Sequence, residues 1–233
     1  MRRPNQAKSI SPYRVATLPS GLTILLRPME QAQSVAVGVW VRVGGRYEPA
    51  AQAGISHFIE HLLFKGTRTR SCEALKQAIE GIGGSLNGFT AEEFTCYLAK
   101  VPARYLGRTV SVLSDMVLHP RFLPADIRKE RDVILEEIRM YEDAPAQSVH
   151  DVFNQLMWPG HPLGNLLSGT VETVRGFSRA DLQRHWRRFY HPKNLVVTCA
   201  GALDPDRLTD WLRRAFPRRA SRAVPRPRPA PRP

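Results

Sequence analysis

The sequence predicts a layered α+β domain, and three observations support this fold class. The chain has 233 residues, of which 42% are hydrophobic and 24% charged, so it can bury a core. Two strand-like segments follow one another near the N-terminus. Later strand-like segments are separated by long helical runs. This mixture favours α+β layers over a regular alternation of strands and crossover helices.

The first strand signals are LTILLRP, which starts at Leu22, and SVAVGVWVRVGG, which starts at Ser34. Valines alternate with smaller or polar residues through much of the second segment, and this is the period of a strand. We expect these two strands to be neighbours in the sheet. Residues 94–101 and 194–201 have the β-branched and aromatic content of two further strands.

Helices are predicted between and after these strands. The run at 51–64 is closed by a lysine and a glycine, and the run at 71–82 begins at a good N-cap, Ser71, and ends at two glycines. Further helices are expected at residues 103–118, 124–141, 145–156, 178–189 and 204–215.

The formal charge of +13 is unevenly distributed. Six arginines and no acidic residue follow Pro217, and the prolines from Pro225 onward predict an extended, disordered tail. We therefore divide the chain into an N-terminal extension (1–12), one domain (13–217) and an Arg/Pro-rich tail (218–233). Such charge supports non-specific association only, and no nucleic-acid motif accompanies it, so no specific nucleic-acid partner is expected.

Three cysteines, Cys72, Cys96 and Cys199, are widely spaced and form no CxxC pair. This argues against a disulfide framework or a cysteine zinc site and favours a reducing compartment. No apolar signal region and no run of about 18 apolar residues occurs, so no membrane partner is expected. We expect a cytoplasmic protein of bacterial type. A mitochondrial matrix protein is the alternative, because no acid precedes Glu30.

The segment GISHFIEHLLFKGT, residues 54–67, places two histidines and a glutamate on a helix with apolar spacing. At about 100° per residue, His57 and His61 lie one turn apart on one face, with Glu60 beside them. Two imidazoles in this arrangement can hold a metal ion while a carboxylate reaches its bound water, and zinc accepts such ligands. Ordinary hydrogen bonds are the alternative, since buried polar groups must be satisfied.

The segment PADIRKERDVILEEIRMYED, residues 124–143, offers a third ligand. Glu130 and Glu137 are seven residues apart, nearly in register after two helical turns, and two acids beside an apolar face favour a cation. Glu136, Asp132 and Glu142 are interpreted as solvated surface residues. The inward face is predicted from residues at helical spacing: Ile127, Ile134, Ile138 and Tyr141.

HFIEHLLFKGT followed by ERDVILEEI resembles the pitrilysin and insulinase group of inverzincin metallopeptidases, especially the branch of mitochondrial processing peptidase β subunits and their bacterial relatives. GGSLNGFTAEEFTCYLAKVP, HPLGNLLSGT and FYHPKNLVVTCAG match in the same order, so the resemblance covers about residues 13–217. It implies a mostly antiparallel sheet covered by helices.

The resemblance also implies a zinc-dependent endopeptidase that acts on extended peptides. By position, His57, His61 and Glu137 would bind Zn²⁺. Glu60 would be the general base, and Glu130 would support the site by a hydrogen bond that orients a ligand histidine.

In the resembling family, peptides add as a strand to the sheet edge beside the zinc helix. The match places that edge at residues 94–98, with residues 87–91 leading into it. Asn87 is the best side-chain candidate for substrate contact, although it could equally be a turn residue. Gly88 stands where members of the resembling family commonly have an alanine. The implied substrate contacts are Asn87, Phe89, Thr90, Phe94, Thr95 and Cys96.

Family members usually carry a second, similar half that supplies an arginine and a tyrosine to the reaction site. Nothing in this chain matches that half, so a homodimer, or a heterodimer with a subunit of the second-half type, is expected. A non-catalytic peptide-binding subunit is the alternative function. Cys72 and Cys96 are expected to be packing residues rather than nucleophiles. The remaining histidines are expected to be surface or packing residues: His119, His150, His161, His185 and His191.

Overall fold

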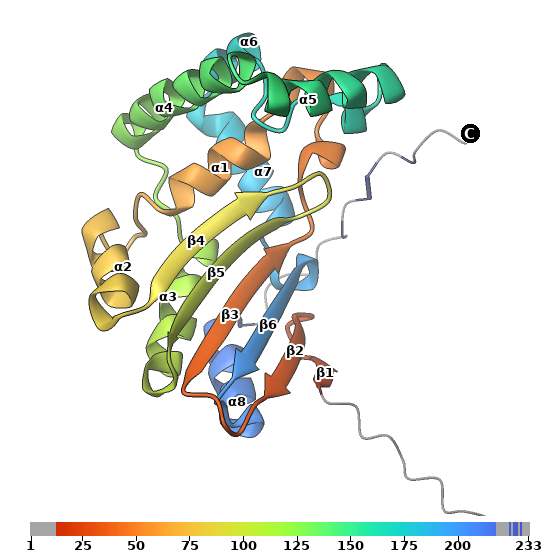
Figure 1. Cartoon of the computed structure of the whole chain (residues 1–233). Coiled ribbons are helices and arrows are strands. Elements are labelled where there is room, and N and C mark those ends of the chain that lie inside the picture. Colours follow the sequence, from red (N-terminus) through yellow and green to blue (C-terminus); the bar gives the residue numbers. More distant parts are fainter. Residues whose placement is uncertain (1–12, 218–223, 225, 228, 230–233) are drawn as a thin grey trace, which may run out of the picture.

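A six-stranded sheet with the strand order β1-β2-β6-β3-β5-β4 organises the molecule (Figure 1). This computed structural model describes residues 13–217, 224, 226, 227 and 229; the predicted N-terminal extension and most of the predicted tail lie outside these residues. Neighbouring strands pair antiparallel except for β2 and β6, which run parallel. The strands are β1 (Arg14–Thr17), β2 (Thr23–Pro28), β3 (Ser34–Val41), β4 (Ser85–Thr90), β5 (Thr95–Pro102) and β6 (Leu195–Gly201).

Helices lie on one face of the sheet and at one end of it. In Figure 1, α3 and α8 lie behind the sheet, and α1, α4, α5, α6 and α7 gather above it. The fold class is therefore confirmed as layered α+β with a mostly antiparallel sheet. The helices are α1 (Ile55–Leu63), α2 (Cys72–Ile79), α3 (Leu106–Leu118), α4 (Pro124–Glu142), α5 (Pro145–Met157), α6 (Val171–Gly176), α7 (Arg179–Phe189) and α8 (Pro205–Ala215).

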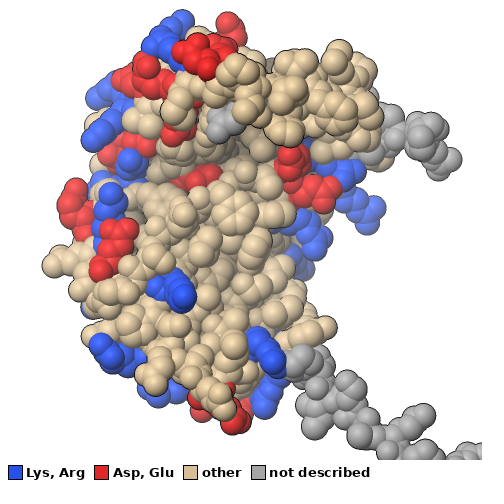
Figure 2. All heavy atoms as spheres, viewed as in Figure 1, with Lys and Arg blue, Asp and Glu red and all other residues tan. Residues whose placement is uncertain are grey.

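The core lies between the sheet and the helices behind it. The buried valines of β3 alternate with residues that face the opposite side, as the sequence pattern predicts. That opposite side of the sheet has no helix over it in Figure 1, and Figure 2 shows few charged side chains across its middle. Within the described residues, no helix is both long and apolar enough to cross a membrane.

β2 and β3 are not neighbours, and the prediction that they pair is wrong. β6 lies between them, parallel to β2 and antiparallel to β3. The buried residues Leu195, Val197 and Cys199 of β6 continue the inner apolar face from β2 to β3. This pairing joins segments far apart in the chain, so no local pattern near Leu22 or Ser34 could reveal it.

The helix predicted at 51–64 begins later, at Ile55, because the preceding chain forms a short 3₁₀ helix, Ala50–Gln52, and then turns at Gly54. Gly54 has φ 89°, and a Cβ there would lie 2.5 Å from the carbonyl oxygen of Ser168. Only glycine fits this left-handed turn without strain. The turn sets the direction in which α1 enters the domain.

Candidate metal centre

The N-terminal end of α1 is held from behind by a buried carboxylate. Glu48 is 1% exposed, and its two oxygens accept hydrogen bonds from the backbone N–H groups of Gly54 and Ser56, each at 2.8 Å. Burial raises the pKa of Glu48, while these bonds at a helix N-terminus favour its anion. Ser56 Oγ also lies 3.2 Å from Nε2 of buried His185 on α7. The helix therefore starts from a fixed position.

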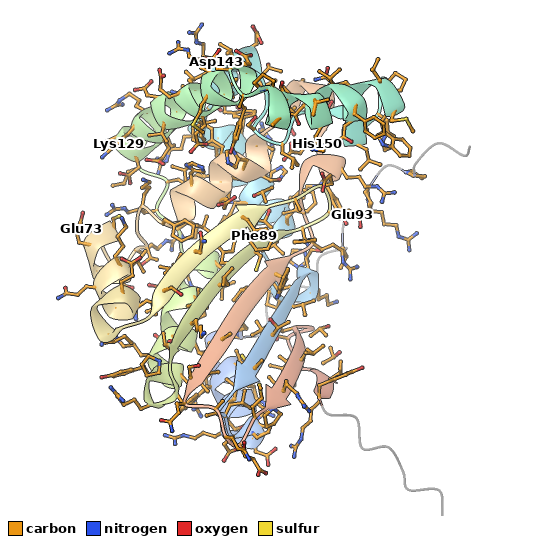
Figure 3. All side chains as sticks on the ribbon, viewed as in Figure 1. Glu73, Phe89, Glu93, Lys129, Asp143 and His150 are labelled. Carbon is orange, nitrogen blue, oxygen red and sulfur yellow. The ribbon has the colours of Figure 1, made fainter. Side chains whose placement is uncertain are left out.

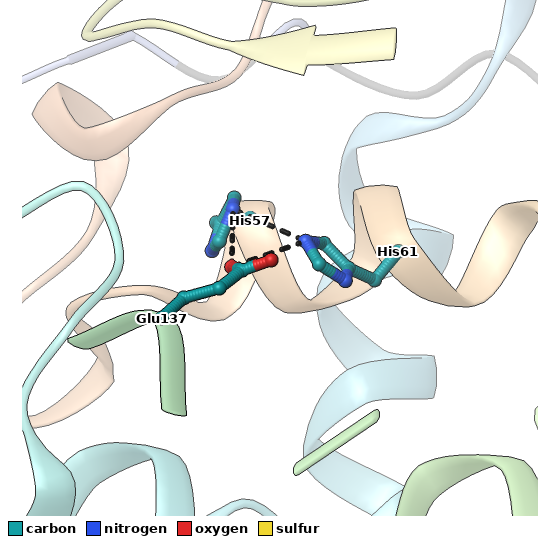
Figure 4. A group of neighbouring side chains, drawn as sticks. All are labelled: His57, His61 and Glu137. Atoms are coloured by element: carbon teal, nitrogen blue, oxygen red, sulfur yellow. Dashed lines mark hydrogen bonds and ion pairs between the residues drawn. The ribbon is translucent and has the colours of Figure 1, made fainter. Parts of the chain in front are cut away.

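His57 and His61 of α1 meet Glu137 of α4 (Figure 4). The Nε2 atoms of the two histidines are 3.3 Å apart. Glu137 Oε2 lies 3.8 Å from His57 Nε2 and 3.6 Å from His61 Nε2. Zinc–ligand bonds of about 2.0–2.1 Å place the corners of a tetrahedron about 3.3–3.4 Å apart. The two histidines match this spacing and Glu137 lies slightly outside it, so the three groups have the donor set and the approximate geometry of a zinc site.

The electrostatics of this cluster favour a bound cation. Burial, together with the neighbouring His61, lowers the pKa of His57 to about 4, so this ring is neutral near pH 7 and has a lone pair to donate. Burial alone would lower the pKa of His61, but the hydrogen bond that its ring donates to Glu130 and the charges of nearby acids raise it. Buried His57 Nδ1 has no hydrogen-bond partner among the described residues.

Glu130 lies behind the cluster and orients His61. Its side chain is 2% exposed, and its Oε2 accepts a hydrogen bond from His61 Nδ1 at 3.2 Å. In a neutral ring this bond leaves the lone pair on His61 Nε2, directed at His57 and Glu137. Lys65 Nζ lies 2.6 Å from the other oxygen of Glu130. Burial would raise the pKa of Glu130, but the hydrogen bonds from His61 and Lys65 lower it.

Glu60 lies beside the cluster on α1 and is 8% exposed. Its Oε2 accepts a hydrogen bond from the Thr90 hydroxyl of β4 at 2.8 Å. Burial raises the pKa of Glu60, and the hydrogen bond from Thr90 opposes this effect. A carboxylate with a raised pKa is a better proton acceptor near neutral pH. The helical spacing locates Glu60, but its contact with Thr90 depends on tertiary structure.

The sheet edge beside α1 is β4, and the prediction that residues 94–98 form this edge is wrong. β5 pairs with β3 on one side and β4 on the other, so Thr95 and Cys96 are inside the protein. Thr95 Oγ1 donates to the carbonyl of Val43, and burial raises the pKa of the Cys96 thiol to about 12. The sequence SLNGFT contains glycine and asparagine, which are rare in strands. Strand propensity therefore did not predict β4.

The remaining predicted contact residues lie on or near this edge. Asn87 and Phe89 are exposed on β4, and Phe89 is on the uncovered face of the sheet (Figure 3). Phe94 is partly buried against Phe89 and Trp40, with ring centroids 5.9 and 5.3 Å away. Asn87 belongs to a strand and not to a turn, since it pairs with Leu98 of β5.

Beside the cluster is a cavity of about 380 Å³ that the sequence did not reveal. Tyr141 was predicted to face inward, but it is 36% exposed and lines this cavity, because α4 extends past the core at its C-terminal end. Glu136 is exposed, as predicted, and pairs with Arg139. The lining residues are His57, Thr90, Tyr141, His150, Asp151, Leu167 and Ser168.

The other histidines have different environments. His150 is exposed and lines the cavity. His119 Nδ1 lies 3.2 Å from Oδ1 of the buried Asp115. His161, His185 and His191 are buried.

Comparison with known proteins gives a family match over most of the chain. A family model described as insulinase (peptidase family M16) matches residues 23–171, and one described as the peptidase M16 inactive domain matches residues 176–233. An uncharacterized zinc protease of Mycobacterium tuberculosis is 43% identical over 210 residues, which are 90% of this chain and 48% of that protein. A probable mitochondrial-processing peptidase subunit beta of Arabidopsis thaliana is 34% identical over 217 residues, 93% of this chain and 41% of that protein.

Solved structures show the same fold. A protease from Helicobacter pylori superposes with a TM-score of 0.88 at 23% identity, covering 92% of this chain and 53% of that one. An M16-like peptidase from Alicyclobacillus acidocaldarius superposes with a TM-score of 0.79 at 24% identity, covering 92% and 51%. The chain spans about half the length of the curated relatives that it matches.

Proposed function

The chain belongs to the insulinase (M16) family of peptidases, and on this premise we propose that it is a zinc-dependent endopeptidase, or the zinc-bearing half of one. The observation that carries the proposal is the convergence of His57, His61 and Glu137 at the spacing of a tetrahedral site, with Glu60 beside them. Two histidines and a carboxylate suit zinc, which is the usual occupant of such donor sets.

Each residue of the proposed site would have a separate role in peptide hydrolysis. Bound zinc would supply Lewis acidity, which polarises the scissile carbonyl and makes water easier to deprotonate. Glu60 would take a proton from the attacking water and pass it to the departing amine. Thr90 would hold the Glu60 carboxylate in place for both transfers. Glu130 would keep His61 in the tautomer that binds metal.

The proposed substrates are extended peptides that add as a strand to β4. An edge strand offers unpaired N–H and C=O groups, and pairing with them gives affinity that depends little on sequence. Asn87, Phe89, Thr90 and Phe94 are the proposed side-chain contacts. Thr95 and Cys96 would support this strand from inside the sheet.

A second domain of the same family is the proposed partner, in a homodimer or a heterodimer. This proposal is supported by the relatives, which are about twice as long as the aligned region. A non-catalytic peptide-binding subunit is the second candidate, because it also would use the β4 edge. The bacterial relatives support a protein of bacterial type. The cytoplasmic location is proposed from the cysteine pattern of the sequence alone.

The test is cleavage of an unstructured quenched-fluorescent peptide by the purified chain, alone and with a chelator. We expect Glu60→Gln to abolish cleavage while zinc stays bound, because it removes the proton acceptor but no ligand. Glu142→Gln, exposed at the end of α4, is the matched control and should cleave normally. Undiminished cleavage by Glu60→Gln would contradict the mechanism. Stoichiometric zinc without cleavage in the unaltered chain would mean that a second half or a partner chain is required for catalysis.

A further inference from the structure

Lys65 forms the far end of a chain of contacts that leads to the proposed metal site. It follows Phe64, the residue that ends α1. Its ammonium lies 2.6 Å from Glu130 Oε1. The other oxygen of Glu130 is bonded to His61 Nδ1 at 3.2 Å. His61 and Lys65 are four residues apart at the same end of α1, so one carboxylate from α4 is shared between them.

This shared carboxylate ties together the two helices that supply the candidate ligands. α1 carries His57 and His61, and α4 carries Glu137 two turns beyond Glu130. A carboxylate that is 2% exposed is costly to bury unless both of its oxygens are satisfied. Lys65 forms an ion pair, at 2.6 Å, with the oxygen that His61 does not use. Without it, that oxygen would be buried with no counter-charge, which disfavours the position of Glu130 that orients His61.

The lysine is itself held in place. Its backbone carbonyl accepts a hydrogen bond from Arg121 Nη2 at 2.5 Å, and its side chain is only 29% exposed. The next residue, Gly66, turns the chain away with φ 117°. The ammonium therefore approaches Glu130 from a fixed backbone position, whereas most surface lysines are flexible.

We propose that Lys65 is a positioning residue of the metal site: through Glu130 it fixes the orientation of His61 and the spacing of α1 and α4. Among the described residues no hydrogen bond or ion pair joins Lys65 to the three candidate ligands, so we expect its effect to pass through Glu130. The inference rests on the proposed zinc site at His57, His61 and Glu137. It extends that site by one charged residue that does not bind the metal.

The test compares zinc affinity, measured by competition with a chromogenic chelator, in the unaltered chain and in Lys65→Met. Loss of an outer partner of a metal ligand weakens metal binding about 10- to 100-fold, and we expect a loss of about tenfold here. Lys65→Arg keeps the cation and should restore most of the affinity. Lys76→Met, on the exposed face of α2, is the matched control and should bind zinc normally.

Three further measurements separate positioning from general destabilisation. The visible absorption spectrum of bound Co²⁺ reports ligand geometry, and it should change in Lys65→Met but not in Lys76→Met. In a double-mutant cycle, Lys65→Met is added to Glu130→Gln. It should then weaken zinc binding by less than about twofold, because the effects of coupled residues are non-additive. Thermal unfolding of each metal-free variant shows that it is folded at the assay temperature.

The outcomes distinguish this inference from the zinc site itself. If the unaltered chain binds zinc, and Lys65→Met binds it with the same affinity and gives the same Co²⁺ spectrum, the role of Lys65 is overturned. The zinc site itself would stand. Full additivity of the two substitutions would also overturn it, since Lys65 would then not act through Glu130. Failure of the unaltered chain to bind zinc would overturn the proposed site and this inference with it.

Discussion

Buried titratable residues set the position of the helix that carries the candidate ligands. Glu48 bonds to the N-terminus of α1, and His185 contacts Ser56, the residue before His57. Neither of them faces the cavity beside the cluster. Their contribution is to stability and to the starting position of α1, whereas Glu60 and Glu130 lie at the candidate metal site itself.

Because His185 is buried, we predict that it makes the free energy of unfolding fall as the pH is lowered. Burial, with a smaller effect of Arg188, lowers the pKa of His185 to about 3, while the same ring in an unfolded chain titrates near about 6.5. Between these values the unfolded chain binds a proton that the native chain does not. This contribution to the free energy of unfolding is therefore complete above about pH 6.5 and is lost as the pH falls towards 3, by up to about 1.4 kcal/mol per pH unit.

Urea unfolding from pH 7 to pH 4 measures this dependence. His185→Gln removes the titrating ring, so its unfolding free energy should fall less steeply with acid than that of the unaltered chain. His150→Gln, at an exposed position, should leave the slope unchanged. Equal slopes for all three proteins would show that His185 is not held neutral in the fold.

At the scale of elements, the turn before α1 is tightly constrained. A Cβ on Gly54 would meet the backbone at Ser168 and Gly169, at 2.5 and 2.7 Å, and φ is 89°. We expect Gly54→Ala to lower the free energy of unfolding by roughly 2–3 kcal/mol, because both strain and overlap oppose a side chain. Gly176→Ala is the control, since no atom lies within 4 Å of a Cβ there. Urea unfolding of both variants gives the difference, and equal stabilities would contradict the assigned turn.

Local periodicity made the helices and His57, Glu60 and His61 predictable, because residues one turn apart share a face whatever surrounds them. Glu137 could be placed near them only through the family resemblance, since its approach depends on how α4 packs on α1. The contact of Thr90 with Glu60 and the place of β6 between β2 and β3 depend on pairings across the chain. β4 was missed because Asn87 and Gly88 disfavour strands in isolation.

At the scale of the whole molecule, the sheet joins both regions that the family models match. β6 lies in the second matched region, yet it pairs with β2 and β3 of the first. One sheet therefore joins the two regions within residues 13–217. Helices α1 and α4, which carry the candidate metal centre, lie above the β4 edge (Figure 1).

The central claim is that His57, His61 and Glu137 form a metal site, and zinc stoichiometry tests it most directly. Glu136 and Glu137 are adjacent on α4, but only Glu137 faces the histidines. After dialysis against limiting zinc, the unaltered chain and Glu136→Gln should each hold one zinc ion per chain. Glu137→Gln should lose zinc, with affinity at least about 100-fold weaker, because a charged ligand is gone. Equal zinc content in the two variants, or none in the unaltered chain, would contradict the account.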